Sequence, residues 1–416
     1  MGSRMKKVTA IFCNRNKPEE CSQELRNNLN AGKWVQLLAD GDASEKLIRK
    51  DILAKEAGVI VRSGGSLNGH KQCLHPCSNL NMSAFATAQW LRAQGIEPRQ
   101  CNIVNTLPLH HVSGLLPWWR SRCWGAEHLW IKPRMLHLPT QLEATIHSMI
   151  SMNTGPLLTS LVPTQLSRLI DDSSGVKCLQ LFSVIWIGGA SIAESLAAKA
   201  RSLRIRLAPC YGATETAAMV TAQRPNDFLS GIDSVGEPLE DIELKLEQSN
   251  ALHVRTKRLA NILNADGSLQ SIANKDGWWE SGDAAQLTIR HHIQQLKIIG
   301  RRDTAINSGG ETIFPEQLQT LLLNDAKRKG LPIDNILLVP TKNEEWGERL
   351  EALVKFQTSQ EKINSFELFN QLKAIVANWS SIERPIAWHN CPELSTNNLG
   401  KWEIKKWQSW VNTKEI

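Results

Sequence analysis

Short apolar runs alternate with helix-like segments up to about residue 235, and this alternation constrains the fold of the 416-residue chain more than any other feature. The runs GVIV (58–61) and NIVNTLPL (102–109) flank the helix-like segment 79–94, and LQLFSVIWIGGA (179–190) precedes another. Strands that alternate with helices predict a mainly parallel sheet with helices on its faces. Because ligands of such sheets bind at the carboxyl ends of the strands, we expect an α/β fold whose site residues follow its strands.

The pattern changes twice further along the chain. Between about 236 and 299 the sequence breaks into hairpin-like pieces such as IELKLEQ and ALHVRT, which predict an antiparallel β portion. From residue 300 a small α+β pattern follows, with a helix whose apolar residues share one face: Leu368, Phe369, Leu372, Ile375 and Val376. We therefore predict a large domain over 1–299 and a small domain over 300–416, divided at GRRDT (300–304).

The charge and cysteine content narrows the class of protein. The 48 Lys and Arg exceed the 41 Asp and Glu by 7, but no basic block stands out, so we expect small anionic ligands rather than nucleic acid. The apolar runs are far shorter than the roughly 20 residues of a membrane-spanning helix. The first residues do not resemble a secretory signal, and the nine cysteines lack a framework spacing, which suits a reducing compartment. We therefore expect a cytoplasmic protein.

A glycine-rich segment, SGGSLNGHKQC (63–73), follows the first apolar run and is expected to precede a helix. Its backbone N–H groups can converge on an anion, and Lys71 can add a positive charge beside a phosphate. A flexible turn is the alternative. A Walker A loop does not fit, because His70 separates Gly69 from Lys71 and Gln72 takes the Ser/Thr position.

Histidines and cysteines near this loop offer two further interpretations. His110 and His111 end a probable strand in LPLHHVSGL (107–115), where a histidine serves a reacting centre or simply fills the core. Cys73 and Cys77 are spaced Cys-x3-Cys without a second pair, which is a weak indication of zinc.

The segment PCYGATETAAM (209–219) contains Tyr211, the only tyrosine of the chain. Its ring can stack on a nucleotide base, and Thr214 and Glu215 place a hydroxyl and a carboxylate directly beyond it. One carboxylate beside a phosphate loop is enough for Mg²⁺, which takes most other ligands from substrate phosphates and water. The segment alone is equally consistent with a helix start capped by Thr214 or Thr216.

Two later motifs have similarly open interpretations. Asp283 follows a glycine in DGWWESGDAAQL (276–287), where a carboxylate can bind a ribose diol or end a turn. Lys401 follows a glycine in NNLGKWEIKKW (397–407), which is either a site lysine or a solvated basic helix end.

The order of these motifs is more informative than any one of them. Their sequence resembles that of the adenylate-forming superfamily of acyl-CoA synthetases, luciferases and carrier-protein adenylation domains. The motifs follow in the order phosphate loop, strand-end histidine, G-G-A, Y-G-x-T-E, G-W-x-x-x-G-D, G-R-x-D and a C-terminal G-K. The resemblance runs from about residue 58 to 405. It implies a large α/β domain with an added antiparallel portion and a small mobile α+β domain that turns near Asp303.

The resemblance also implies the substrates ATP and coenzyme A and the cofactor Mg²⁺. Residue by residue, it implies a nucleotide site made of Ser63, Gly64, Gly65, Ser66, Lys71, Gly188, Gly189, Ala190, Tyr211, Gly212, Asp283 and Arg301. Thr214 matches a phosphate ligand and Glu215 the magnesium ligand. Lys401 matches the lysine that contacts both the substrate carboxylate and the α-phosphate, and His111 matches a histidine beside the acid substrate.

Within the superfamily, the segments LPLHHVSGL, SLVPTQLSRLI, NSGGETIFPEQL and CPELSTNNLGKW resemble the o-succinylbenzoate–CoA ligases of menaquinone and phylloquinone synthesis. Asn68 and His70 depart from the family's loop, and the loop begins at residue 63, earlier than usual, so the N-terminal subdomain is expected to be shortened. The alternatives are another acyl- or aryl-CoA synthetase and a non-catalytic adenine-nucleotide-binding protein. The sequence leaves a homo-oligomer open.

Overall fold

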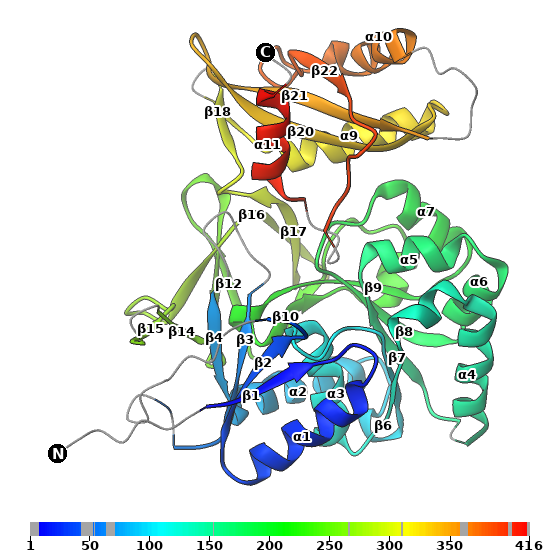
Figure 1. Cartoon of the computed structure of the whole chain (residues 1–416), viewed down its shortest axis with the longest axis vertical. Helices are drawn as coiled ribbons and strands as arrows, with labels where there is room; N and C mark the ends of the chain where they lie inside the picture. The colour runs from blue at the N-terminus through cyan, green and yellow to red at the C-terminus, as the bar shows by residue number, and fades with distance from the viewer. Residues whose placement is uncertain are drawn as a thin grey trace.

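A computed structural model describes residues 8–42, 53, 55–63, 71–152, 154–264, 267–308, 311–357, 365–397 and 402–413. The described strands form four sheets. Figure 1 shows the C-terminal elements, coloured from yellow to red, above the other three sheets.

The first sheet combines the N-terminal strands with a pair of strands from much later in the chain. Its order is β1 (Thr9–Cys13), β2 (Trp34–Ala39), β3 (Gly58–Arg62), β4 (Gln72–Pro76), β14 (Asn261–Leu263) and β15 (Leu269–Ser271). The strands β1, β2 and β3 are parallel, with α1 (Pro18–Asn30) as the crossover between the first two. The β3–β4 pair is an antiparallel hairpin.

The surroundings of the glycine-rich segment include a strand that the sequence analysis did not identify. The expected helix, α2 (Cys77–Arg92), does follow the segment, but β4 comes before it. The segment therefore connects two antiparallel strands, and Lys71 stands at the base of that connection.

A seven-stranded sheet forms the centre of the molecule and confirms the α/β prediction. Its order is β11 (Glu237–Pro238), β10 (Ala218–Ala222), β9 (Leu207–Ala213), β8 (Phe182–Ile187), β7 (Leu157–Leu161), β5 (Asn102–Asn105) and β6 (Glu127–Trp130). The five strands from β6 to β9 are parallel, and β10 and β11 are antiparallel. The helices between these strands are α3 (Val112–Trp124), α4 (Pro139–Met152), α5 (Pro163–Ile170), α6 (Ser173–Gln180), α7 (Glu194–Ser202) and α8 (Pro225–Leu229).

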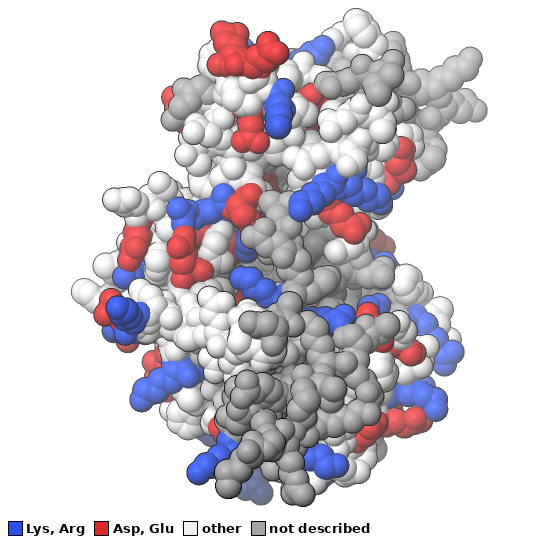
Figure 2. All heavy atoms as spheres, turned by 60° about the vertical axis from the view of Figure 1, so that its left-hand side comes forward, with Lys and Arg blue, Asp and Glu red and all other residues white. Residues whose placement is uncertain are grey.

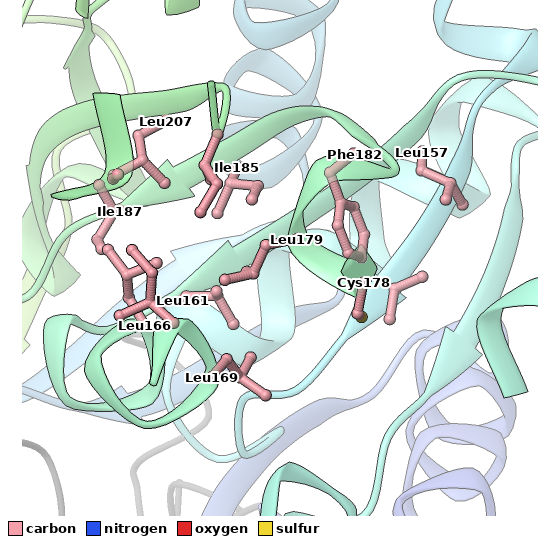
Figure 3. Packing of buried hydrophobic residues seen from close by; sticks show 14 of the residues in the cluster. Leu157, Leu161, Leu166, Leu169, Cys178, Leu179, Phe182, Ile185, Ile187 and Leu207 are labelled. Atoms are coloured by element: carbon pink, nitrogen blue, oxygen red, sulfur yellow. The ribbon is translucent and has the colours of Figure 1, made fainter. Parts of the chain in front are cut away.

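Burial on both faces explains the continuous apolar runs of the central strands. Along β8, Ile185 and Ile187 join the buried cluster under α5 and α6, which Figure 3 shows. The alternate residues Val184 and Trp186 join a second cluster on the opposite face. Because successive side chains of a strand point to opposite faces, only an apolar run satisfies both layers.

A four-stranded sheet confirms the predicted antiparallel portion. Its order is β12 (Glu243–Leu246), β13 (Ala251–Arg255), β16 (Trp278–Arg290) and β17 (Ile293–Arg301). A two-residue turn joins the last two strands, and its residues His291 and His292 both have positive φ, as hairpins with this turn require.

The C-terminal sheet has the order β19 (Glu311–Ile313), β18 (Ile306–Ser308), β21 (Gly347–Phe356) and β20 (Ile333–Asn343), with β22 (Ala387–Asn390) beside β21. It carries α9 (Pro315–Arg328), α10 (Ser365–Ile375) and α11 (Ile404–Asn412). As predicted, α10 and the turn after it turn one apolar face inward, with Leu368, Leu372 and Val376 buried. The division of the chain at residue 300 stays a prediction.

Short 3-10 turns complete the described structure: Pro98–Gln100, Pro133–His137, Thr214–Thr216, Gln248–Asn250 and Val376–Asn378. Among the described helices, none is both long enough and apolar enough to cross a membrane. Figure 2 shows Lys and Arg interspersed with Asp and Glu on the face that it presents.

Candidate active site

Tyr211 meets two of the other candidate residues where three strands converge. It lies on β9, and its hydroxyl donates a hydrogen bond of 2.5 Å to Oδ2 of Asp283 on β16. Arg301 stands opposite Asp283 in the β16–β17 register and brings its NH1 to 3.5 Å from Oδ1. Burial, with the Asp283 charge adding to it, raises the pKa of Tyr211 well above its ordinary value, so the phenol stays protonated.

Arg301 extends this arrangement to the expected hinge residue. Its Nε and NH2 donate to the two carboxylate oxygens of Asp303 at 3.0 and 2.7 Å. The hydrogen bond to Asp303 raises the pKa of Arg301 above its ordinary value. Glu316, in the first turn of α9, lies near the same charges, and burial raises the pKa of its carboxyl group. A chain of polar contacts therefore runs from Tyr211 through Asp283 and Arg301 to Asp303.

Thr214 and Glu215 lie in the short turn between β9 and β10. The structure shows that the capped-helix interpretation of this segment is wrong: Thr214–Thr216 is a single 3-10 turn, and Ala213 precedes it. Both residues are half-buried, and no residue in the described part of the chain forms an ion pair with the Glu215 carboxylate. The backbone N–H of Ala260 donates to Glu215 O at 2.8 Å.

The G-G-A segment follows β8, next to β9. Gly189 has a φ of +85°, which favours glycine, and a Cβ on Gly188 would lie 3.0 Å from Sγ of Cys210. Gly212 also needs its missing side chain, because a Cβ there would meet the backbone oxygen of Ala218 at 2.3 Å. The glycines therefore allow close packing within the protein, and Gly188, Gly189, Ala190 and Gly212 lie near the carboxyl ends of two parallel strands, where ligands of such sheets bind.

Ser63 and Lys71 close the base of the loop between β3 and β4. The N–H of Ser63 donates to Lys71 O at 2.8 Å, and the N–H of Lys71 donates to Ser63 Oγ at 3.0 Å. Burial raises the pKa of Cys73, the negative charge of Glu215 adds to this rise, and the positive charge of Lys71 opposes it. Lys71 and Glu215 therefore both act on the same thiol. Gly64, Gly65, Ser66 and Lys401 lie outside the described residues.

The two adjacent histidines have different surroundings. His110 is buried, and burial lowers its pKa to about 4. It lines a small cavity of about 20 Å³ together with Cys13, Arg15 and Trp130. His111 is half-buried and immediately precedes α3. The assignment of His111 rather than His110 to the acid substrate stays a prediction.

Two buried arginines were missed by the sequence reasoning. Arg120 on α3 is 2% exposed, and its guanidinium carbon lies 5.2 Å from the centre of the Trp186 ring. Its Nε and NH2 have no hydrogen-bond partner among the described residues. Burial lowers its pKa to about 9, so the side chain remains largely charged at pH 7. Its helical spacing from buried Leu116, four residues earlier, was the signal that could have found it.

Arg258 is the second of these arginines, and it is fully buried. It lies between β13 and β14 and donates to Asp241 and to several backbone oxygens of the turn that follows β9. Nothing in the local sequence TKRLA distinguishes it from a surface arginine.

Comparisons with known proteins agree with this architecture. Residues 70–257 match the model of the AMP-binding enzyme family. The chain is 29% identical over 310 residues to the 2-succinylbenzoate–CoA ligase of Escherichia coli (strain K12). The alignment covers 74% of this chain and 60% of that relative. The chain thus spans about three fifths of the length of this curated relative.

Solved structures show the same fold. The o-succinylbenzoate CoA synthetase of Bacillus subtilis in complex with its acyl-adenylate intermediate superimposes with a TM-score of 0.72 at 18% identity, covering 97% of this chain and 88% of that one. The anthranilate CoA ligase AuaEII in complex with anthranoyl-AMP gives a TM-score of 0.68 at 15% identity, covering 99% and 79%. The matched family model thus covers residues 70–257, and the likeness to these structures shows a shared fold.

Proposed function

We propose that this protein ligates o-succinylbenzoate to coenzyme A in an ATP-dependent reaction through an acyl-adenylate, as a cytoplasmic step of menaquinone or phylloquinone synthesis. The observation that carries the proposal is the meeting of Tyr211, Asp283 and Arg301 beside the Thr214–Glu215 turn. A ring face, a carboxylate–guanidinium pair and a second carboxylate are the groups that an adenine, a ribose and a metal-bound phosphate need. The similarity to curated 2-succinylbenzoate–CoA ligases supports the acid.

In this proposal the nucleotide lies across the carboxyl ends of β8 and β9. Adenine stacks on Tyr211 beside Gly188, Gly189 and Ala190, with the backbone of Gly212 alongside. Asp283 and Arg301 bind the ribose, and the loop residues Ser63, Gly64, Gly65, Ser66 and Lys71 surround the phosphates. The position of these residues near the carboxyl ends of β8 and β9 supports this arrangement, because ligands of parallel sheets bind at that edge.

The residues present fit a magnesium ion that Glu215 would hold beside the phosphates. Mg²⁺ binds through one or two carboxylates and keeps phosphate and water as its other ligands. Glu215 offers a half-buried carboxylate without an ion-pair partner in the described part of the chain. When bound, the ion would offset negative charge on the phosphates. Thr214 would donate its hydroxyl to a phosphate oxygen next to it.

The chemistry then needs positioning and charge stabilisation more than covalent catalysis. A carboxylate oxygen of the acid attacks the α-phosphorus of ATP, the bond to pyrophosphate breaks, and the acyl-adenylate forms. Lys401 and Lys71 offset the charge that builds up on the phosphates during this step. The coenzyme A thiolate next attacks the acyl carbon, and AMP leaves with the bonding electron pair.

The two steps require two arrangements of the C-terminal residues. We place the large domain over 1–299 and the small domain over 300–416. A rotation of the small domain about Asp303 would withdraw Lys401 after adenylation. The same rotation would bring the segment around Glu311 to the site for thioester formation. The Arg301–Asp303 pair supports a hinge here, because it ties that residue directly to the proposed ribose site.

The proposed acid carries a second carboxylate, which needs a cation. Arg120 supports this part of the proposal, because it is a buried guanidinium whose Nε and NH2 have no partner among the described residues. The helix that carries Arg120 begins directly after His111. We therefore assign Arg120 to the distal carboxylate, together with His111, which the resemblance assigns to the acid substrate.

The rival functions are a synthetase for a different aryl acid and a nucleotide-binding protein without activity. The anthranilate CoA ligase fold is nearly as similar as that of the o-succinylbenzoate enzyme, so the fold alone does not choose between acids. We therefore propose to measure acid-dependent exchange between ATP and pyrophosphate, followed by thioester formation with coenzyme A. The panel is o-succinylbenzoate, its analogue without the ring carboxylate (4-oxo-4-phenylbutanoate), benzoate and anthranilate.

We expect exchange to be fastest with o-succinylbenzoate and much slower with the analogue that lacks the ring carboxylate. Fastest exchange with another acid would replace the proposed substrate. ATP binding without exchange for any acid would favour the inactive nucleotide-binding protein.

A further inference from the structure

Residues 214–219 form the turn that carries Thr214 and Glu215 together with the start of β10. All six of their backbone oxygens accept hydrogen bonds. The oxygens of Thr214, Glu215 and Ala217 accept hydrogen bonds from His75 Nε2 at 2.7 Å, Ala260 N at 2.8 Å and Ser83 Oγ at 2.6 Å. The oxygen of Ala218 accepts from the hydroxyl of Thr216 at 2.8 Å. The remaining two oxygens, of Thr216 and Met219, accept from the guanidinium of Arg258.

Arg258 contacts three of these six backbone oxygens from a single side chain. Its NH2 donates to Met219 O at 2.7 Å, and its NH1 donates to Thr216 O and lies 3.3 Å from Ala217 O. The Nε donates to Asp241 Oδ2 at 2.7 Å, so the buried charge has a carboxylate partner. All three nitrogens of the guanidinium are therefore engaged, and the side chain is 0% exposed.

The supported turn contains backbone conformations that alanine disfavours. Ala217 and Ala218 have φ angles of 50° and 79°, in the left-handed region. Residues without a glycine's freedom stay in this region only when their surroundings hold them there, and such positions cluster at functional sites. The hydrogen-bond donors that keep the turn in this conformation come from β4, from α2 and from the segment between β13 and β14.

We propose that Arg258 is a positioning residue that holds the strained turn so that Thr214 and Glu215 face the nucleotide phosphate and its metal ion. Arg258 touches no substrate itself; it acts through the backbone oxygens of Thr216, Ala217 and Met219. This role rests on the proposed function, because it assigns Thr214 and Glu215 to Mg-ATP. It makes affinity for the metal-bound nucleotide depend on a side chain behind the site.

The test compares nucleotide binding by Arg258→Lys and Arg258→Met with binding by the unaltered chain. Calorimetry measures the Kd for ATP once in saturating Mg²⁺ and once in EDTA, without acid or coenzyme A. Lysine keeps the charge but not the planar fork, so both variants lose donors to the turn. We expect the Kd for ATP in Mg²⁺ to rise by about 10- to 100-fold, as for other residues that orient metal ligands. The Kd in EDTA should rise much less, because only the contact of Thr214 with phosphate is lost there.

Arg224→Met is the matched control. Arg224 also belongs to the β10–β11 region and forms a two-point pair with Glu237, but it contacts none of the six backbone oxygens. It should leave both Kd values unchanged. Thermal unfolding of each variant, measured beside binding, shows that the proteins compared are folded, and Arg258→Lys remains available if Arg258→Met does not fold.

Equal losses of ATP affinity in Mg²⁺ and in EDTA would mean that Arg258 serves only the general fold. An unchanged ATP affinity under both conditions would also contradict the positioning role. Because the assay contains no acid, a wrong substrate assignment leaves it intact: Mg-ATP would still bind while exchange with o-succinylbenzoate failed. If the unaltered chain bound no Mg-ATP, the positioning role and the proposed function would both be overturned.

Discussion

Arg258 and Arg120 are both buried, but their guanidinium groups differ in what surrounds them. Arg258 has a carboxylate partner and donates to several backbone oxygens, whereas Arg120 lies against the ring of Trp186 with its Nε and NH2 unpaired among the described residues. Burying a charge without partners costs free energy, and a ligand of opposite charge can offset that cost. Under the two proposals above, the comparison separates an arginine that positions the site from one that binds the acid substrate.

The largest expected difference is in stability. Arg258→Met leaves Asp241 and several backbone oxygens without partners, so we expect the free energy of unfolding to fall by about 3–5 kcal/mol. Arg120→Met removes a buried charge whose Nε and NH2 have no hydrogen-bond partner among the described residues, so stability should hold or rise. Urea unfolding followed by tryptophan fluorescence measures both changes. If the two variants shift the midpoint equally and in the same direction, the distinction between the arginines is wrong.

The next effect concerns the acid substrate. Arg120→Met should lower exchange with o-succinylbenzoate on the order of 100-fold, because truncating one partner of a buried charge pair costs roughly 2–5 kcal/mol. The Kd for Mg-ATP should stay the same. Exchange with 4-oxo-4-phenylbutanoate, which lacks the ring carboxylate, serves as the control and should respond much less. A loss of the same size with both acids would remove Arg120 from the distal-carboxylate site.

Tyr211, on β9, offers a smaller effect. Tyr211→Ala removes the proposed stacking face and should weaken ATP binding by roughly 1–3 kcal/mol. Tyr211→Phe keeps the ring but loses the hydrogen bond to Asp283, so most of the affinity should remain. Calorimetry with ATP distinguishes the variants. Equal losses in both would assign the contribution of Tyr211 to its hydroxyl instead of its ring.

The smallest effect concerns His75, which donates to the backbone oxygen of Thr214, and the fall of protein stability with falling pH. Burial lowers the pKa of His75 from 6.5 to about 4. The unfolded chain therefore binds this proton more readily, and stability falls as pH falls from about 6.5 to about 4. Burial lowers the pKa values of His110 and His128 in the same direction, so they contribute to the same fall.

His75→Gln can still donate to Thr214 O but does not titrate. Its unfolding midpoint, followed from pH 7 to 4.5, should therefore fall less steeply than that of the unaltered chain. His147→Gln, which replaces an exposed histidine, is the control and should leave the slope unchanged. An unaltered slope in His75→Gln would show that His75 does not carry part of the acid sensitivity.

The sequence predicted the parts of the fold that local patterns encode. Apolar runs marked the central strands such as β8, hairpin-like pieces marked the antiparallel sheet, and one apolar face marked α10. The order of motifs indicated the family and selected Tyr211, Asp283 and Arg301, which the structure brings together. Their assigned roles in binding stay predictions.

Features that depend on distant partners escaped the sequence. The strand β4 was missed because Gln72 and Pro76 bound a run of only three residues, and its pairing with β14 lies far along the chain. The burial of Arg258 likewise follows from Asp241 and from backbone oxygens near Met219, none of which the local sequence identifies. Arg120 had a weak local signal in its helical spacing, but only the packing shows its unpaired nitrogens.

The pairing of β4 with β14 also sets an order for folding during synthesis. β1 to β4 leave the ribosome early, but β14 and β15 complete their sheet only when residue 271 has emerged. Until then β4 presents an unpaired edge, which can pair with another chain. Pairings between distant segments form slowly, and exposed edges favour aggregation. A nascent chain that stalls between β4 and β14 should therefore depend on chaperones more than one that stalls after β15.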